Sequence, residues 1–218
     1  MRTILVLNPK GGSGKSTVAM NIAGYFASRG ARVALADCDP QSSCRDWLAV
    51  RPERAAPIRS AEVVSGKLRV PRSAEFVVID TPAAVHGQRL VSLVQTSQTM
   101  VIPMLPSPMD MRAAEHFINE LFSLRKLINR RIKLATVANR VREDTLVAAS
   151  LEEYLGALKL PGGQRLPFIA ALRNSQNYVQ AVERGLSLFE FAPSRTETDR
   201  LQWRPLLRWL SGSRSLPG

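Results

Sequence analysis

The chain has 218 residues, which is enough for a full hydrophobic core, and its formal net charge of +12 points to a polyanionic partner. No apolar run approaches the roughly 20 residues that a membrane-spanning helix needs, and the first strand begins too near the N-terminus to leave room for a signal peptide. The cysteines, Cys38 and Cys44, are too few for a disulfide framework, so we expect a cytoplasmic protein.

Strands and helices alternate along the chain. Apolar runs predict strands at residues 4–7, 32–36, 75–79, 99–103, 131–138 and 165–171. Helical patterns cover residues 18–26, 109–129, 145–158, 175–184 and 196–210, with Asp144 or Thr145 as the N-cap of the third, while residues 51–73 follow neither pattern. Such alternation predicts one α/β domain over residues 1–218, with three layers: a mostly parallel twisted sheet and helices on both of its faces.

A glycine-rich loop at residues 8–17 lies between the first strand and the first helix. In this position backbone N–H groups can wrap a polyphosphate, Lys15 can reach the β- and γ-phosphates, and the Ser16 hydroxyl can bind magnesium. Pro9 occupies the place of the first glycine in the usual phosphate-loop pattern, and Lys10 follows it. A plain turn between strand and helix is the alternative, but a plain turn has no need of residues 15–17.

Aspartates follow two further strands. Asp37 and Asp39 come after the second predicted strand, and Asp80 comes after the third. In open α/β sheets this edge binds ligands, and an aspartate after a buried strand suits the magnesium-associated Walker B role. A helix cap or a turn residue is the alternative for each of them.

These residues resemble the ParA-type partition ATPases, within the deviant Walker A class that also includes MinD. The resemblance is carried by residues 10–17, 37–41, 78–82, 102–103, 106–110 and 173–191, and therefore spans nearly the whole chain. It is greatest to small plasmid partition proteins such as ParF, which lack a long N-terminal DNA-binding extension. The resemblance implies a P-loop NTPase fold.

The resemblance also implies roles for individual residues. Lys10 would reach across an ATP-sandwich dimer to the phosphates held by the partner, and Asp39 would lie in a first switch that positions water. A second switch would follow at residues 81–87, and Asn139 would contact adenine, although it could equally cap a turn. The phosphate cradle would comprise Gly11, Gly12, Ser13, Gly14, Lys15, Ser16 and Thr17, with Ser16, Asp39 and Asp80 at the magnesium ion.

The function implied is slow hydrolysis of ATP to ADP by a dimer that binds the nucleoid and positions a cargo. The cargo would be a plasmid, a chromosome or a protein organelle such as the carboxysome, and a ParB-like or adaptor protein would stimulate hydrolysis. DNA contacts are expected from Arg200, Arg204 and Arg208, which share one helix face, and from Arg195 beside them. A solvated helix face, or an arginine-rich proteome, is the alternative. Trp203 is expected to pack that helix onto the body.

Three rival functions remain open. A MinD-like ATPase would bind membrane through residues 203–210, which are basic and apolar, although Pro205 interrupts that pattern. An iron–sulfur carrier of the same superfamily would need cysteines that bridge a dimer, whereas Cys38 and Cys44 flank the first switch. A non-enzymatic scaffold is the third, but nothing marks a dead site, because Lys15, Asp39 and Asp80 are present.

Overall fold

The computed structural model describes residues 1–64, 67–128, 132–142, 146–159, 163 and 165–217. Its centre is an eight-stranded sheet in the order β4-β3-β2-β5-β1-β6-β7-β8. All neighbouring strands are parallel except β3 and β4, which confirms the predicted mostly parallel sheet. The strands are β1 (Arg2–Val6), β2 (Val33–Asp37), β3 (Ile58–Val64), β4 (Lys67–Arg69), β5 (Phe76–Asp80), β6 (Thr99–Met104), β7 (Lys133–Val141) and β8 (Phe168–Arg173).

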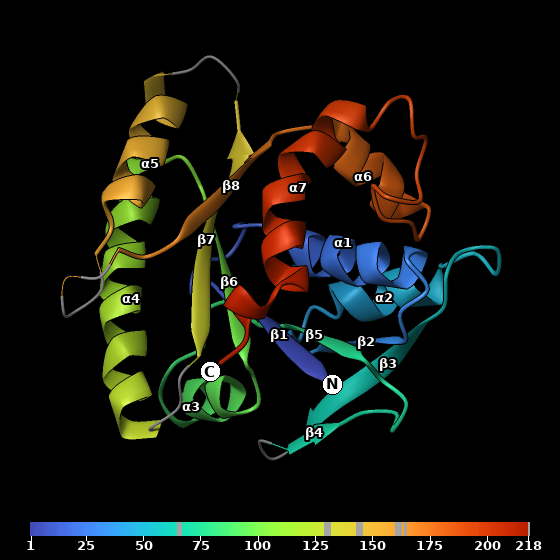
Figure 1. The fold of residues 1–218 in the computed structure, drawn as a ribbon, viewed down its shortest axis with the longest axis horizontal. Coiled ribbons are helices and arrows are strands. Elements are labelled where there is room, and N and C mark those ends of the chain that lie inside the picture. The colour runs from blue at the N-terminus through green and yellow to red at the C-terminus, as the bar shows by residue number, and fades with distance from the viewer. Residues whose placement is uncertain (65–66, 129–131, 143–145, 160–162, 164, 218) are drawn as a thin grey trace.

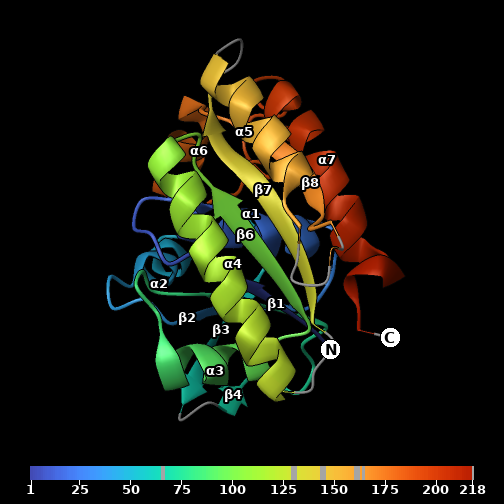
Figure 2. The same ribbon diagram turned by 90° about the vertical axis from the view of Figure 1, so that its left-hand side faces the viewer.

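Helices cover both faces of this sheet (Figure 1). In Figure 2, α4 lies across the front of the sheet. The helices are α1 (Lys15–Ser28), α2 (Ser43–Ala49), α3 (Gly87–Gln95), α4 (Pro108–Ile128), α5 (Leu146–Ala157), α6 (Gln176–Glu183) and α7 (Glu197–Ser211), followed by a short 3₁₀ helix (Ser213–Ser215). The three-layer α/β architecture is therefore as predicted.

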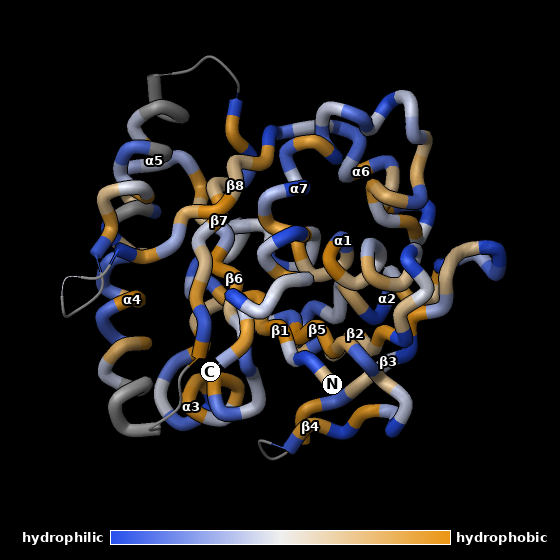
Figure 3. The backbone as a smooth tube through the Cα atoms, in the orientation of Figure 1, coloured by the Kyte–Doolittle hydropathy of each residue, from blue (hydrophilic) through white to orange (hydrophobic). Residues whose placement is uncertain are grey.

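Two hydrophobic cores lie on opposite faces because side chains alternate along each strand. On β1, Leu5 belongs to the core beneath α3, α4 and α5, whereas Ile4 and Val6 belong to the core beneath α1, α2 and α7. The tube in Figure 3 shows the apolar residues running along the central strands. Both faces of the central strands are buried, which explains their continuous apolar sequences.

Several elements differ from the predicted ones. The undecided segment 51–73 contains β3 and β4, and the predictions omit α2 and α3 altogether. The last strand begins at Phe168 rather than residue 165, because Arg165 pairs instead with Lys159 in an isolated antiparallel bridge. The strand predicted at 131–138 continues to Val141, and residues 144–145, the predicted helix cap, lie outside the described residues.

The register of the central strands brings their carboxyl ends to one edge. Val6 at the end of β1 is level with Asp80 at the end of β5, and Asp80 is level with Asp37 at the end of β2. The loop that follows β1 leaves from this edge and leads into α1. Sequence segments far apart in the chain therefore meet at the carboxyl edge of the sheet.

Candidate nucleotide-binding site

The loop between β1 and α1 requires glycine at two positions. Gly12 and Gly14 have φ of 76° and 85°, which side chains rarely adopt. A Cβ on Gly14 would also lie 2.2 Å from Nδ2 of Asn139. That Nδ2 donates a hydrogen bond of 2.8 Å to the Ser13 carbonyl oxygen, so the side chain of Asn139 holds the loop from β7. Asn139 lies within β7 rather than after it.

The start of the loop is fixed to its neighbours by hydrogen bonds. Asn8 donates from Nδ2 to the Pro103 carbonyl oxygen (2.6 Å), and its Oδ1 accepts from the backbone N–H of Lys10 (2.8 Å). The carbonyl oxygen of Pro9 accepts from the backbone N–H of Ala84 at 2.7 Å. Ala84 belongs to the segment predicted as the second switch. The loop and this segment are therefore in direct contact.

Lys15 is folded back into the loop. Its Nζ donates to the Lys10 carbonyl oxygen at 3.0 Å. Burial lowers the pKa of Lys15, and the carboxylates of Asp80 and Asp39 oppose that shift. The ammonium is thus held by a single carbonyl at the place where the resemblance puts phosphate. A phosphate oxygen could take over that carbonyl's role as acceptor.

Asp80 is completely buried behind the loop. The Cys44 thiol donates to its Oδ2 at 3.3 Å, whereas its Oδ1 has no hydrogen-bond partner. Burial raises the pKa of Asp80 to about 6, against the opposing effects of Ser16, Cys44 and Lys15. An orphaned buried carboxylate oxygen is costly unless a proton or a cation satisfies it.

The oxygen donors at this edge fit a magnesium ion. They are the Ser16 hydroxyl and the carboxylates of Asp39 and Asp80, and magnesium is typically held by one or two carboxylates together with substrate phosphates. Among the described residues, no group of three or more His, Cys, Asp or Glu side chains forms a metal site made of protein alone. The donor set suits a magnesium ion bound jointly with a nucleotide.

A cavity of about 520 Å³ opens over the loop. It is lined by residues 11, 12 and 14–17 of the loop, by residues 39–41 and 82–83, and by Arg89 and Arg140. Asp80 lies behind this cavity rather than in its wall, and Asn139 lines a neighbouring cavity of about 340 Å³ together with Thr17 and Tyr178. The structure therefore brings together the predicted loop, Asp39 and Asp80, and it places Asn139 beside the next cavity.

Two arginines in this cavity were not predicted as site residues. Arg89 comes from the first turn of α3 and Arg140 from the end of β7, next to Asn139. The adjacency to Asn139 is the one sequence signal that points to Arg140. Arg89 had no such signal, because α3 was not among the predicted helices.

Lys10 lies away from the cavity over its own loop. Its Nζ pairs with Oδ1 of Asp110, in the first turn of α4, at 2.9 Å, and the lysine side chain is 38% exposed. Lys10 is not among the residues that line this cavity. Of the two loop lysines, Lys15 alone faces that cavity.

Cys38 and Cys44 are both free cysteines. Burial raises the pKa of Cys38 to about 11 and raises that of Cys44 well above its usual range, so both remain thiols at neutral pH. The Cys44 thiol donates its hydrogen bond to the buried carboxylate of Asp80. Nothing at these two residues favours the iron–sulfur alternative.

The predicted DNA-binding arginines fall into three groups. Arg204 and Arg208 are exposed and line a cavity of about 590 Å³ with Arg29, which follows α1 as its C-cap. Arg200 also lines this cavity, but burial lowers the pKa of its guanidinium. The guanidinium donates hydrogen bonds to the carbonyl oxygens of Leu188 and Phe191. Arg195 is exposed outside this cavity. The structure therefore gives Arg200 a role in the fold.

The apolar side of α7 faces the core. Trp203, Leu206 and Leu210 are buried in the core shared with α1, and α7 continues through Pro205 without a break. The apolar face of α7 that a membrane-binding tail would need is therefore buried in this core, which counts against the MinD-like alternative. Within the described part of the chain, no helix is both long and apolar enough to cross a membrane.

The chain resembles several known proteins in sequence and in fold. The chain is similar to the Maintenance of carboxysome distribution protein A of Halothiobacillus neapolitanus, with 30% identity over 207 residues, 91% of this chain and 92% of that protein. Its fold is similar to that of a chain in the MinC:MinD cell division protein complex of Aquifex aeolicus (TM-score 0.73, 15% identity, 97% and 96% of the two chains). It is also similar to an ATP complex of an McdA variant from Cyanothece (TM-score 0.69, 18% identity, 94% and 96%). Residues 4–188 match the model of the CobQ/CobB/MinD/ParA nucleotide binding domain, and the chain belongs to that family.

Proposed function

We propose that this chain is a ParA-like ATPase that binds and slowly hydrolyses ATP, dimerises on the bound ATP and, as a dimer, binds DNA without sequence specificity. The observation that carries the proposal is the arrangement at the carboxyl edge of the sheet. Lys15 faces the phosphate cavity and the orphaned Asp80 carboxylate lies behind it, while Lys10 is directed elsewhere. The eight strands that the structure describes belong to one sheet, in keeping with a single domain over residues 1–218.

The chemistry assigned to the site is positioning and charge neutralisation. Phosphoryl transfer needs little covalent help from the protein, so Lys15 and the loop N–H groups hold the phosphates while Asp39 orients the attacking water. A magnesium ion held by Ser16, Asp39 and Asp80 would neutralise phosphate charge. The buried Oδ1 of Asp80 supports this assignment, because it has no hydrogen-bond partner and needs a cation once the carboxylate ionises.

Lys10 is proposed to act on the ATP of the partner subunit. In the structure of one chain it lies outside the phosphate cavity, and it is held by an ion pair that is partly exposed to solvent. Solvent partly screens this pair on its lysine side, so Lys10 can leave Asp110 at a modest cost. Dimerisation and catalysis would then depend on the same bound nucleotide.

Binding to DNA is proposed to use the exposed arginines of α7. Arg204 and Arg208 lie one turn apart and line one cavity with Arg29, and the whole chain carries a charge of +12. Such contacts to phosphates bind any sequence and weaken steeply as salt rises. The proposed location is therefore the nucleoid, in the cytoplasm.

The cargo is proposed to be a large assembly, a plasmid or a protein organelle, attached through an adaptor that stimulates hydrolysis. The relative from Halothiobacillus neapolitanus, which is named for carboxysome distribution and aligns with 91% of this chain, favours the organelle. The adaptor would be a separate protein with a role like that of ParB.

A DNA mobility-shift assay with the purified chain tests the proposal. We expect a shift with ATP and magnesium, and with a nonhydrolysable ATP analogue, but little or none with ADP. Lys15→Ala serves as the control that cannot hold ATP. Equal binding in all nucleotide states would contradict the proposed switch, and no binding in any state would remove DNA as the partner.

A further inference from the structure

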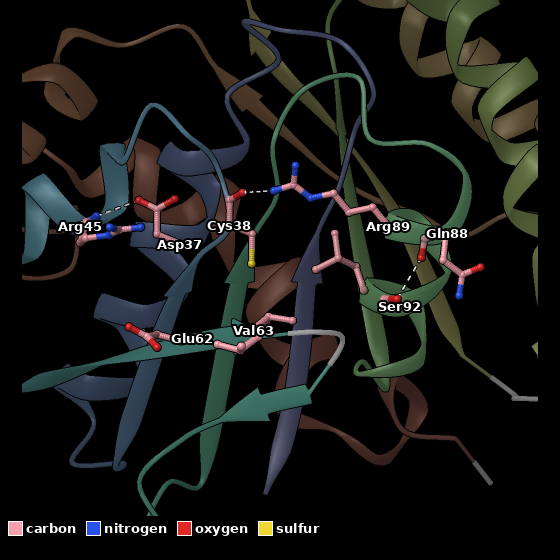
Figure 4. A pocket seen from close by; sticks show the side chains of 10 residues that line it. Asp37, Cys38, Arg45, Glu62, Val63, Gln88, Arg89 and Ser92 are labelled. Atoms are coloured by element: carbon pink, nitrogen blue, oxygen red, sulfur yellow. Dashed lines mark hydrogen bonds between the residues drawn. The ribbon is translucent and has the colours of Figure 1, made fainter.

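Arg89 stands between two cavities at the carboxyl edge of the sheet. It lines the phosphate cavity, with Lys15 and Asp39, and also a second cavity of about 510 Å³, with Asp37, Cys38 and Arg45. Figure 4 shows its side chain extending from α3 toward the loop after β2. A guanidinium in this place can contact both a bound phosphate and the loop that carries Asp39.

The contact with the loop is already made. One terminal nitrogen of Arg89 donates a hydrogen bond of 2.9 Å to the carbonyl oxygen of Cys38 (Figure 4). Cys38 lies between Asp37 and Asp39. A guanidinium has five N–H donors in a rigid fork, so this bond leaves others for a second acceptor.

The charge of Arg89 has no acidic partner in the part of the chain that the structure describes. Lys10, by contrast, is paired with Asp110, and Lys15 lies close to Asp80 and Asp39. Arg89 is also exposed, so little energy is needed to reorient it. An unpaired cation in the wall of a phosphate cavity is available for an anion.

The position of Arg89 in the cavity indicates which phosphate it would reach. Its hydrogen bond to Cys38 puts Arg89 next to the loop that continues into Asp39, one of the proposed magnesium ligands, and residues 39–41 line the same cavity. Arg140, by contrast, also lines the neighbouring cavity that contains Asn139 and Tyr178. The terminal phosphate lies at the magnesium end of the nucleotide, and the base lies at the other.

We propose that Arg89 binds the terminal phosphate of ATP and, through the Cys38 carbonyl oxygen, holds the loop that carries Asp39 against that phosphate. The proposal rests on the ATPase function proposed above. With ADP bound, Arg89 would keep its contact with the loop alone. Arg89 would thus bind ATP more strongly than ADP, and only with ATP would it hold the loop that carries Asp39 against a terminal phosphate.

Binding of fluorescent ATP and ADP derivatives, with magnesium, to Arg89→Ala and Arg89→Lys tests this proposal. We expect Arg89→Ala to weaken ATP binding by about 10-fold or more while ADP binding changes by less than about 2-fold. Arg89→Lys should recover part of the lost affinity, because it restores the charge without the fork. Arg45→Ala is the matched control, since Arg45 is an exposed arginine that lines the second cavity only.

The outcomes separate this inference from the function on which it rests. Unchanged ATP affinity in Arg89→Ala, or an equal loss for ATP and ADP, overturns the assignment to the terminal phosphate while the ATPase function stands. A wild-type chain that binds neither nucleotide overturns both. Retained ADP binding in Arg89→Ala also shows that the variant is folded.

Discussion

Lys10 and Asp110 form an ion pair within one subunit, with 2.9 Å between Nζ and Oδ1. The pair joins the loop after β1 to the first turn of α4. The lysine is 38% exposed and the aspartate 12%, so solvent screens the pair only partly. If Lys10 acts across a dimer, this pair must break before the dimer can close, and Asp110 then opposes dimerisation.

Replacing Asp110 with Asn should therefore strengthen ATP-dependent dimerisation. The amide keeps the size of the side chain but no longer holds the ammonium, and the gain should be about 2- to 5-fold in the dimer dissociation constant, given the usual strength of such pairs. Sedimentation velocity over a concentration series with ATP measures it. Glu115→Gln, an exposed acid on the same helix, is the control, and a dimer weakened by Asp110→Asn would contradict the account.

Replacing Asp80 with Asn should stabilise the nucleotide-free chain at neutral and basic pH. Burial raises the pKa of Asp80 from 3.8 to about 6, so the folded chain holds this proton more tightly than the unfolded chain does. The stability that the bound proton adds to the folded chain is complete below pH 3.8 and is lost as the pH rises through 6. The penalty above pH 6 is about 3 kcal/mol. Thermal melts should therefore show the largest gain for the variant near pH 8 and a smaller one at pH 5. A gain independent of pH would point to another cause.

Gly14→Ala should destabilise the chain more than Gly12→Ala does. Both glycines have positive φ, but only at position 14 would a Cβ clash with Asn139, whereas none of the atoms that the structure describes lies within 4 Å of a Cβ at position 12. The strain alone costs about 1 kcal/mol, and the clash should add about 1–3 kcal/mol. Chemical denaturation of the nucleotide-free chain compares the two. Adding Asn139→Ala to Gly14→Ala should recover part of the loss, and no recovery would mean that the clash is not the cause.

The double variant Arg204→Ala/Arg208→Ala should weaken DNA binding at every sequence. Each lost phosphate contact should lower the slope of log affinity against log salt by about 0.9, so the slope should fall by about 2. Arg69→Ala/Arg72→Ala removes the same charge from exposed positions at and after β4 and is the control. Fluorescence anisotropy over a salt series measures the slopes, and equal slopes for the two variants would remove α7 from the DNA surface.

The central sheet and the loop could be predicted because local sequence determines them. The run Ile4–Leu7 is apolar at every position since both of its faces are buried, and the glycines and Lys15 follow it at the spacing of a phosphate loop. Asp80 could be predicted because it ends another run of this kind. In each case a few consecutive residues carry the whole signal.

The remaining features depend on contacts between distant segments. The strand β3 is at most half-buried along most of its length, so its alternation is weak, and α2 spans only seven residues. The ion pair of Lys10 joins residues a hundred positions apart, and Arg89 reaches the phosphate cavity only because α3 follows the second switch. Arg200 also depends on a contact that its local sequence does not show. Its helical spacing predicted contact with DNA at the surface, whereas its guanidinium donates hydrogen bonds to carbonyl oxygens of the segment before α7.

The mass of the Lys10→Ala variant with ATP tests the central claim most directly. By light scattering after gel filtration, the wild-type chain should be a dimer with ATP and magnesium and a monomer with ADP. Lys10→Ala should still bind ATP yet remain a monomer, because only its reach to the partner is lost, whereas Lys15→Ala should lose both binding and dimerisation. A Lys10→Ala variant that binds ATP and dimerises like the wild type would contradict the claim that two subunits close on one another through Lys10.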